Sequence, residues 1–299
     1  MEIETTPEYT TFNQTKCIQS VLREVKLDPT AERDSELRLT EEEYDEYRTS
    51  NGQLQWVVVT RPEIGFHTST CASHAHDPTL TAAKCLNKTV KFLKETAHRQ
   101  RIIPTLDMKT WRNVVYADAS LGNVENAKTQ GGRAVNLEDA HGQCSTLICR
   151  SGKLHRVAQS SFDAETLIAV DATGDGFGIA LLLQEIEEGP PQGLLEKVLR
   201  RSFESGHQER TALLFPPHVM SDGKGTVQAC YGTKDIACKR RQQDIASLRE
   251  ALQIGDVAGV HHLQGTKNPV DPLTKSLPFK TPTMQILEEM LTGKAPEKN

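Results

Sequence analysis

One stretch near the middle of the chain, Val114–Ser120, constrains the fold more than any other. Four consecutive residues are apolar or aromatic, an acid follows at Asp118, and small residues and turn formers come next. A short apolar run that ends at a turn is typical of a buried strand. A carboxylate at the end of such a strand is costly unless a partner or a cation compensates its charge. An acid that caps a turn is the simpler interpretation of Asp118 alone, so its significance depends on the other acids of the chain.

The composition describes a soluble protein. The chain has 299 residues, enough for one large domain or two ordinary ones, and its mean hydropathy is -0.49. It has no run of 18 apolar residues, and it starts with acidic residues, so neither a membrane span nor a secretory signal is expected. Seven cysteines without a CxxC pair favour reduced thiols over a disulfide framework or a zinc site. We therefore expect an intracellular protein, cytoplasmic or nuclear, that is not secreted and has no membrane partner.

The charge is negative overall but unevenly distributed. The net charge is -5, but the first fifty residues carry thirteen acids and six bases, whereas the remainder has 27 acids and 29 bases. Phosphate contacts need clustered lysine and arginine, so any binding of nucleic acid must be local. The basic cluster Lys239, Arg240 and Arg241 is the candidate for such contacts, although a solvated helix face explains it equally well.

The first third of the chain has mainly helical periodicity. Residues 1–13 show no period and predict a frayed end. Apolar residues at three-and-four spacing predict a short helix over 14–26 and a longer one over 80–93. A capping threonine followed three residues later by glutamate predicts a helix that begins after Thr40, with a candidate interruption at 50–52. This part contains no arrangement of residues that suggests catalysis.

From Trp111 onward the pattern becomes mixed. Alternating and apolar segments predict three antiparallel strands, followed by a long helix capped by Ser160 or Ser161. A strand, a helix, a strand and a last helix complete the order. The predicted ranges are strands at 114–120, 131–137 and 143–150, a helix at 161–188, a strand at 218–222, a helix at 234–254, a strand at 257–263, and a helix beginning at Asp271.

Four acids occupy comparable places in this order. Asp118 and Asp222 end strands, while Glu165 and Asp271 begin helices. In an α/β layer, strand ends and helix starts at one edge converge. Four converging carboxylates need cations, and oxygen ligands of this kind suit Mg²⁺ or Mn²⁺. Two such ions would support hydrolysis of a phosphodiester.

Several ordered motifs resemble the ribonuclease H domain of copia-type LTR retrotransposon Pol polyproteins. They are Tyr116–Ser120, Ser160–Glu165, Ser221–Lys224 and Val270–Lys275, and the stretch Asp235–Glu250 is also similar. Upstream segments, among them Gly52–Trp56 and Thr60–Ile64, resemble the C-terminal (thumb and connection) part of the reverse transcriptase that precedes that domain. The resemblance covers roughly residues 12–277.

This resemblance implies a ribonuclease H-like α/β fold. Its mixed five-stranded sheet has the first three strands antiparallel and is flanked by helices, and a mostly helical segment precedes it in the chain. The expected domains are a helical reverse-transcriptase remnant at 1–98, a ribonuclease H-like domain at 111–277 with an insertion at 189–217, and a tail at 278–299. The expected partners are an RNA/DNA hybrid and the rest of a retroelement polyprotein.

The resemblance also implies a function. Asp118, Glu165, Asp222 and Asp271 would be both the metal ligands and the catalytic residues of a two-metal hydrolase that cleaves the RNA strand of the hybrid. The basic cluster and His261 would contact the substrate. The paired aspartates of a polymerase are absent, so this chain is not expected to copy RNA. The alternative is a catalytically inactive remnant that binds nucleic acid or serves a structural role.

Overall fold

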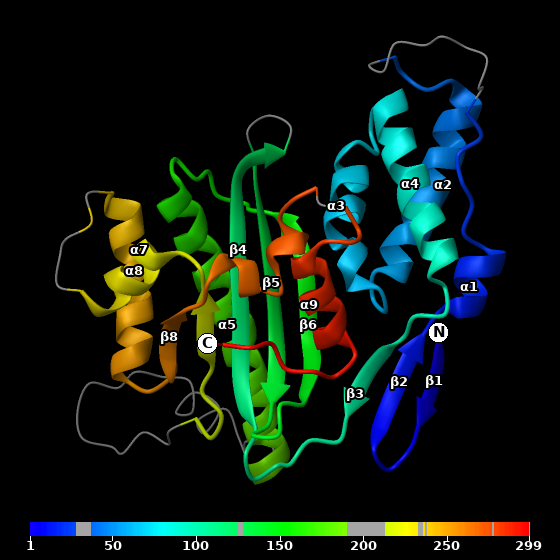
Figure 1. Cartoon of the computed structure of the whole chain (residues 1–299). Coiled ribbons are helices and arrows are strands. Elements are labelled where there is room, and N and C mark those ends of the chain that lie inside the picture. The colour runs from blue at the N-terminus through cyan, green and yellow to red at the C-terminus, as the bar shows by residue number, and fades with distance from the viewer. Residues whose placement is uncertain are drawn as a thin grey trace.

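The computed structural model describes residues 1–27, 37–124, 128–189, 213–232, 236, 238–276 and 278–298. Figure 1 shows a smaller part, made by the first third of the chain, beside a larger part built on a sheet. Most of the expected insertion 189–217 lies outside the described residues. The helices are α1 (Thr15–Ser20), α2 (Glu41–Val57), η1 (Pro62–Ile64), α3 (Gly65–Ser73), α4 (Leu80–Glu95), α5 (Ser161–Glu188), α7 (Lys224–Tyr231), α8 (Lys239–Gln253), η3 (Gly265–Lys267), η4 (Asp271–Leu273) and α9 (Pro282–Leu291).

A five-stranded mixed sheet is the frame of the larger part. Its strand order is β6-β5-β4-β7-β8, so β4 is central. β4, β5 and β6 are antiparallel, whereas β7 and β8 continue the sheet in parallel with β4. The predicted fold class is confirmed, because helices flank this sheet and a largely helical segment precedes it. The strands are β4 (Arg112–Val124), β5 (Lys128–Glu138), β6 (Cys144–Lys153), β7 (His218–Ser221) and β8 (Gly259–His262).

β4 is buried on both faces, which explains its continuous apolar run. Val114 and Tyr116 belong to a hydrophobic cluster that includes α9. Val115 and Ala117 point to the opposite face and belong to a cluster that includes residues of α5. Since side chains alternate along a strand, Asp118 lies on the same face as Val114 and Tyr116.

The long helix predicted at 161–188 is confirmed as α5. The Ser160 hydroxyl accepts a hydrogen bond from the Asp163 N–H at 3.1 Å and so caps its N-terminus. By length and composition alone this helix could also cross a membrane. It packs against β4, and a Cβ at Gly176 would lie only 2.5 Å from a methyl carbon of Val115. The apolar face of α5 therefore belongs to the core of the sheet.

The helices of the smaller part largely follow their sequence signals. Thr40 and Glu43 form the predicted capping box, and α2 continues through 50–52 without an interruption. The helix predicted over 14–26 is shorter, because α1 ends at Ser20. The core of this part is formed by apolar residues of α1, α2 and α4.

The prediction of a frayed end over residues 1–13 is wrong. This segment forms β1 (Glu2–Thr5) and β2 (Tyr9–Asn13), which join β3 (Arg101–Pro104) in a three-stranded antiparallel sheet of order β1-β2-β3. Threonine and aromatic residues favour strands, and β3 supplies the hydrogen bonds that a hairpin alone lacks. The first ninety-eight residues are thus not wholly helical.

The C-terminal segment completes the core of the sheet. Met284, Leu287 and Met290 of α9 are buried in the cluster that covers one face of β4. Just before this helix, Phe279 stacks on Phe92 of α4 with ring centroids 3.7 Å apart. Residues 278–298 therefore pack against both parts of the molecule.

Candidate functional site

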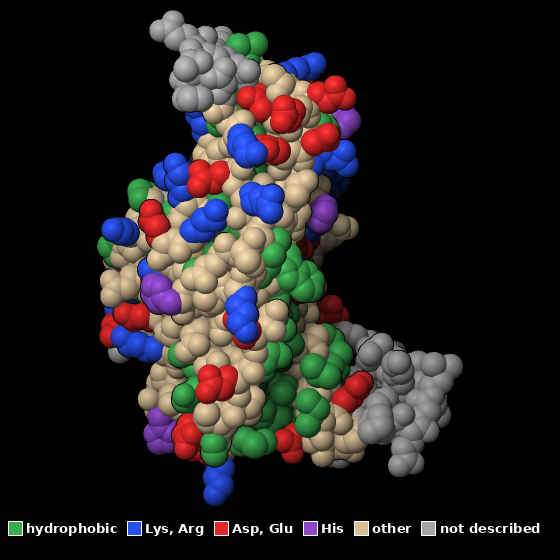
Figure 2. All heavy atoms as spheres, turned by 90° about the vertical axis from the view of Figure 1, so that its right-hand side faces the viewer, with side chains coloured by type: hydrophobic (Ala, Val, Ile, Leu, Met, Phe, Trp, Pro, Cys, Tyr) green, Lys and Arg blue, Asp and Glu red, His purple; other side chains and the backbone are tan. Residues whose placement is uncertain are grey.

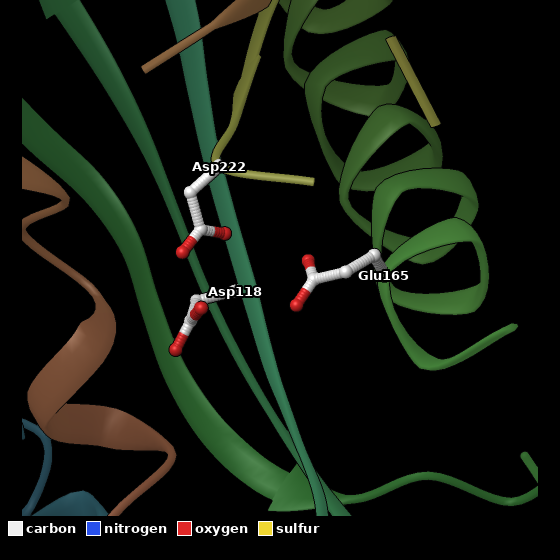
Figure 3. Close-up of side chains that lie close together, drawn as sticks. All are labelled: Asp118, Glu165 and Asp222. Atoms are coloured by element: carbon white, nitrogen blue, oxygen red, sulfur yellow. The ribbon is translucent and has the colours of Figure 1, made fainter. Parts of the chain in front are cut away.

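Three of the four predicted acids meet where β7 ends beside β4. The prediction that Asp118 ends a strand is wrong, because β4 continues to Val124 and Asp118 pairs with Gly132 of β5 in its middle. Ala117 of β4 and Ser221 of β7 are register partners, so Asp118 and Asp222 follow them side by side. Glu165 reaches the same place from the first turns of α5, as Figure 3 shows. One carboxylate oxygen from each residue lies within 4.8 Å of the others. Within the described part of the chain, these acids are the one group of three or more potential ligands at such spacing.

The backbone around the acids is shaped to bring them close. Glu165 Oε1 accepts a hydrogen bond from the Ala119 N–H at 3.4 Å, which links α5 to β4. A Cβ at Gly223 would lie 2.9 Å from the Glu165 Cβ, so the residue after Asp222 has no room for a side chain. A Cβ at Gly265 would lie 3.0 Å from Asp222 Oδ2. A side chain after Asp222 would thus displace Glu165, and one at Gly265 would press on the Asp222 carboxylate.

Burial and mutual repulsion favour the protonated forms of these acids. Burial, and then the charge of Asp222, raises the pKa of Asp118 to about 7. Burial, followed by the charges of Asp118 and Asp222, raises the pKa of Glu165 to about 9. Burial also raises the pKa of Asp222. Without a cation the site therefore holds protons near neutral pH.

The donor set fits a divalent cation. Glu165 Oε2 and Asp222 Oδ1 are buried and have no hydrogen-bond partner among the described residues. An unpartnered buried oxygen is costly, and a cation bound between the carboxylates would remove that cost. Carboxylate oxygens are the ligands that Mg²⁺ and Mn²⁺ prefer. The three acids could hold such an ion.

Asp271, the fourth predicted acid, lies next to this group and outside it. It is the first residue of η4, a 3-10 turn and not the predicted helix. The Thr283 hydroxyl donates a hydrogen bond to Asp271 Oδ2 at 3.2 Å, and the Lys275 ammonium contacts Oδ1. Asp271 is nevertheless close enough for its charge to contribute to the raised pKa of Asp118.

Two residues at this site were not singled out by the sequence. Thr274 is buried, and its hydroxyl donates a hydrogen bond to Asp118 Oδ2. Lys275 contacts Asp271, and although burial lowers the pKa of Lys275, the charges of Asp271, Asp118 and Asp222 raise it. Both residues belong to the motif Val270–Lys275, so their proximity to Asp271 in the chain was the available signal.

The predicted substrate residues fall in two different environments. Lys239 and Arg240 are exposed at the start of α8. Arg241 is buried, with Nη1 2.7 Å from Asp244 Oδ2 and Nε 3.8 Å from Asp163 Oδ1. The prediction that Arg241 contacts a substrate is therefore wrong, because its guanidinium holds α8 to α5.

His261, the remaining predicted substrate residue, is exposed in β8. Its register partner is Met220 of β7, and its Nε2 lies 3.4 Å from Nδ1 of His218. Met220 precedes Asp222 by two residues, so His261 pairs two positions before the level of Asp222. The structure does not join its side chain to the three acids.

Comparison with known proteins finds a likeness to solved structures only. No family model matches the chain, and no curated protein matches it. LC11-RNase H1, isolated from compost by a metagenomic approach, is 14% identical over 55% of this chain and 92% of its own, with a TM-score of 0.35. A second structure of LC11-RNase H1, in complex with an RNA/DNA hybrid, is 15% identical over 55% of this chain and 94% of its own, with a TM-score of 0.34. The ribonuclease H1 of the halophilic archaeon Halobacterium salinarum is 13% identical over 55% of this chain and 94% of its own, with a TM-score of 0.32. We assign the ribonuclease H-like fold from the strand order and strand directions of the chain itself.

Proposed function

We propose that this chain is a metal-dependent ribonuclease that hydrolyses the RNA strand of an RNA/DNA hybrid. The observation that carries the proposal is the group formed by Asp118, Glu165 and Asp222, with oxygens within 4.8 Å of one another. Two of these carboxylates keep a buried oxygen that no described residue satisfies. A structural acid cluster would be expected to satisfy its oxygens with donors from the protein.

In this reaction, different residues would bind the ions, orient a ligand and leave space for the site. Asp118, Glu165 and Asp222 would hold the ions, with Asp271 as a further ligand. When bound, two divalent ions supply activation of water and stabilisation of the leaving oxygen. The Thr274 hydroxyl fixes the orientation of Asp118, and Gly223 leaves the space that Glu165 occupies. Burial of the site lowers the local dielectric, which strengthens each attraction between a carboxylate and a cation.

Selection of RNA would depend on the 2′-hydroxyl, the group that distinguishes RNA from DNA at a given site. Lys239 and Arg240 are exposed and could contact the phosphates of the hybrid. The motifs around the acids, and the upstream segments described above, support an origin in a copia-type retrotransposon. We propose that the smaller part descends from the reverse transcriptase and that the chain has no polymerase activity.

A cleavage assay on matched duplexes tests the proposal. With Mg²⁺ or Mn²⁺, the protein should cut the RNA strand of an RNA/DNA hybrid and leave duplex DNA intact. Asp118→Asn and Asp222→Asn should each abolish cleavage. Asp171→Asn, which removes an exposed carboxylate from α5, is the matched control and should cut normally. Binding of the hybrid without cleavage by the wild-type protein would instead support a catalytically inactive remnant.

A further inference from the structure

The two oxygens of Asp271 have different partners. The Thr283 hydroxyl donates to Oδ2 at 3.2 Å, while the Lys275 ammonium contacts Oδ1. Asp271 is largely buried, with 13% of its side chain exposed, and each of its two oxygens has one partner. Asp271 therefore differs from Glu165 and Asp222, each of which keeps an unpartnered oxygen.

Lys275 has the freedom to leave this position. Its side chain is 40% exposed, and a lysine has a flexible four-carbon stem with a compact charge at its end. Rotation of that stem toward solvent would free Asp271 Oδ1 without repacking the core. Thr274, its neighbour, is by contrast buried, and its hydroxyl donates a hydrogen bond to Asp118.

We propose that Lys275 is an internal counter-ion that competes with a divalent cation for Asp271. The inference rests on the proposed function, since it supposes that the neighbouring acids bind metal. One ion held by Asp118, Glu165 and Asp222 leaves Asp271 paired with Lys275. Asp271 becomes a ligand of a second ion only when the ammonium releases it. Lys275 thereby weakens binding of the second ion and stabilises the site while that ion is absent.

Titration of the full chain with Mn²⁺ at constant pH tests this inference. The free Mn²⁺ is measured by electron paramagnetic resonance, which reports how many ions bind each chain and how tightly. Lys275→Gln removes the competing charge, and Lys275→Arg keeps it. Lys267→Gln is the matched control, because it removes the same charge from η3, eight residues earlier, where no ion pair is found among the described residues.

In the wild-type protein we expect one tight ion and a second, weaker one. Lys275→Gln should tighten the second ion by about tenfold or more and leave the first nearly unchanged. Lys275→Arg and Lys267→Gln should bind as the wild type does. An additional Asp271→Asn substitution should abolish the gain produced by Lys275→Gln, because the effect acts through that carboxylate.

The outcomes separate the inference from the proposed function. If wild type and Lys275→Gln bind Mn²⁺ equally, or if Lys267→Gln tightens binding as much, the competition does not exist although the metal site does. If none of these proteins binds Mn²⁺, both the metal site and the competition are refuted. Binding of Mn²⁺ by Lys275→Gln alone would also contradict the inference, because the first ion should bind the wild-type protein while Lys275 stays paired with Asp271.

Discussion

Ala117 of β4 and Ser221 of β7 are partners in parallel register, so Asp118, within β4, and Asp222, just after β7, are neighbours. This pairing joins two acids that are far apart in the chain. α5 supplies the third acid, Glu165, because the first turns of this capped helix lie beside these two residues (Figure 3). The pairing of β4 with β7, together with the packing of α5, therefore determines the positions of the three acids.

The stability of the metal-free protein should fall as the pH rises. Unfolded aspartate and glutamate titrate near 4, whereas Asp118 titrates at about 7 and Glu165 at about 9 in the folded protein. From about pH 4 up to these values the folded state binds more protons than the unfolded state, so the free energy of unfolding decreases. Thermal melting in a chelator at pH 5, 6, 7 and 8 measures this decline, which we expect to reach a few kcal/mol. A melting temperature that rises steadily over this range would contradict the raised pKa values.

Gly223→Ala should damage the site more than the fold. The new Cβ would lie 2.9 Å from the Glu165 Cβ and would force that carboxylate away from its partners. We expect cleavage of the hybrid to fall by about tenfold or more, because small displacements in a catalytic site are costly. Gly174→Ala in α5 meets no atom within 4 Å and serves as the control, with activity unchanged and a small gain in stability. Equal activity in the two variants would show that the close approach at Gly223 is not required.

Lys239 and Arg240 should contribute to binding of the hybrid, whereas Arg241 should contribute to folding. Lys239→Ala and Arg240→Ala should each reduce the slope of log affinity against log salt by about 1. Lys109→Ala is the control: it removes an exposed charge just before the start of β4 and should leave that slope unchanged. Arg241→Ala should lower the free energy of unfolding by about 3 kcal/mol, because the buried Asp163 loses its cationic partner, while Asp244 keeps its ion pair with Arg156. Salt titrations of hybrid binding and urea denaturation separate these effects.

The fold class and three of the acid positions could be predicted because their signals are local. An apolar run that ends in an acid marks Asp118, and a serine cap places Glu165 one turn into a long helix. Residues 1–13 could not be assigned in this way, because the partner strand of β2 is β3, some ninety residues later. A hairpin with a distant partner leaves little periodicity in its own sequence.

The direction in which a long side chain points was also not predictable from the sequence. Arg241 belongs to an apparently uniform basic run with Lys239 and Arg240, yet the turn of α8 buries it against α5. This contact depends on how α8 packs against α5, which local patterns do not specify. Lys275 differs, because it lies four residues after Asp271 and its contact with that acid is local.

Thermal melting of the wild type and Asp222→Asn, with and without Mn²⁺, tests the central claim that the acids form one cation site. Removing one of several repelling carboxylates should raise the melting temperature of the metal-free protein. Millimolar Mn²⁺ should raise the melting temperature of the wild type by several degrees, because the ion binds the folded state, and should have little effect on Asp222→Asn. If Mn²⁺ leaves the wild-type curve unchanged, and Asp222→Asn is neutral or destabilising without metal, the three carboxylates do not form a cation site.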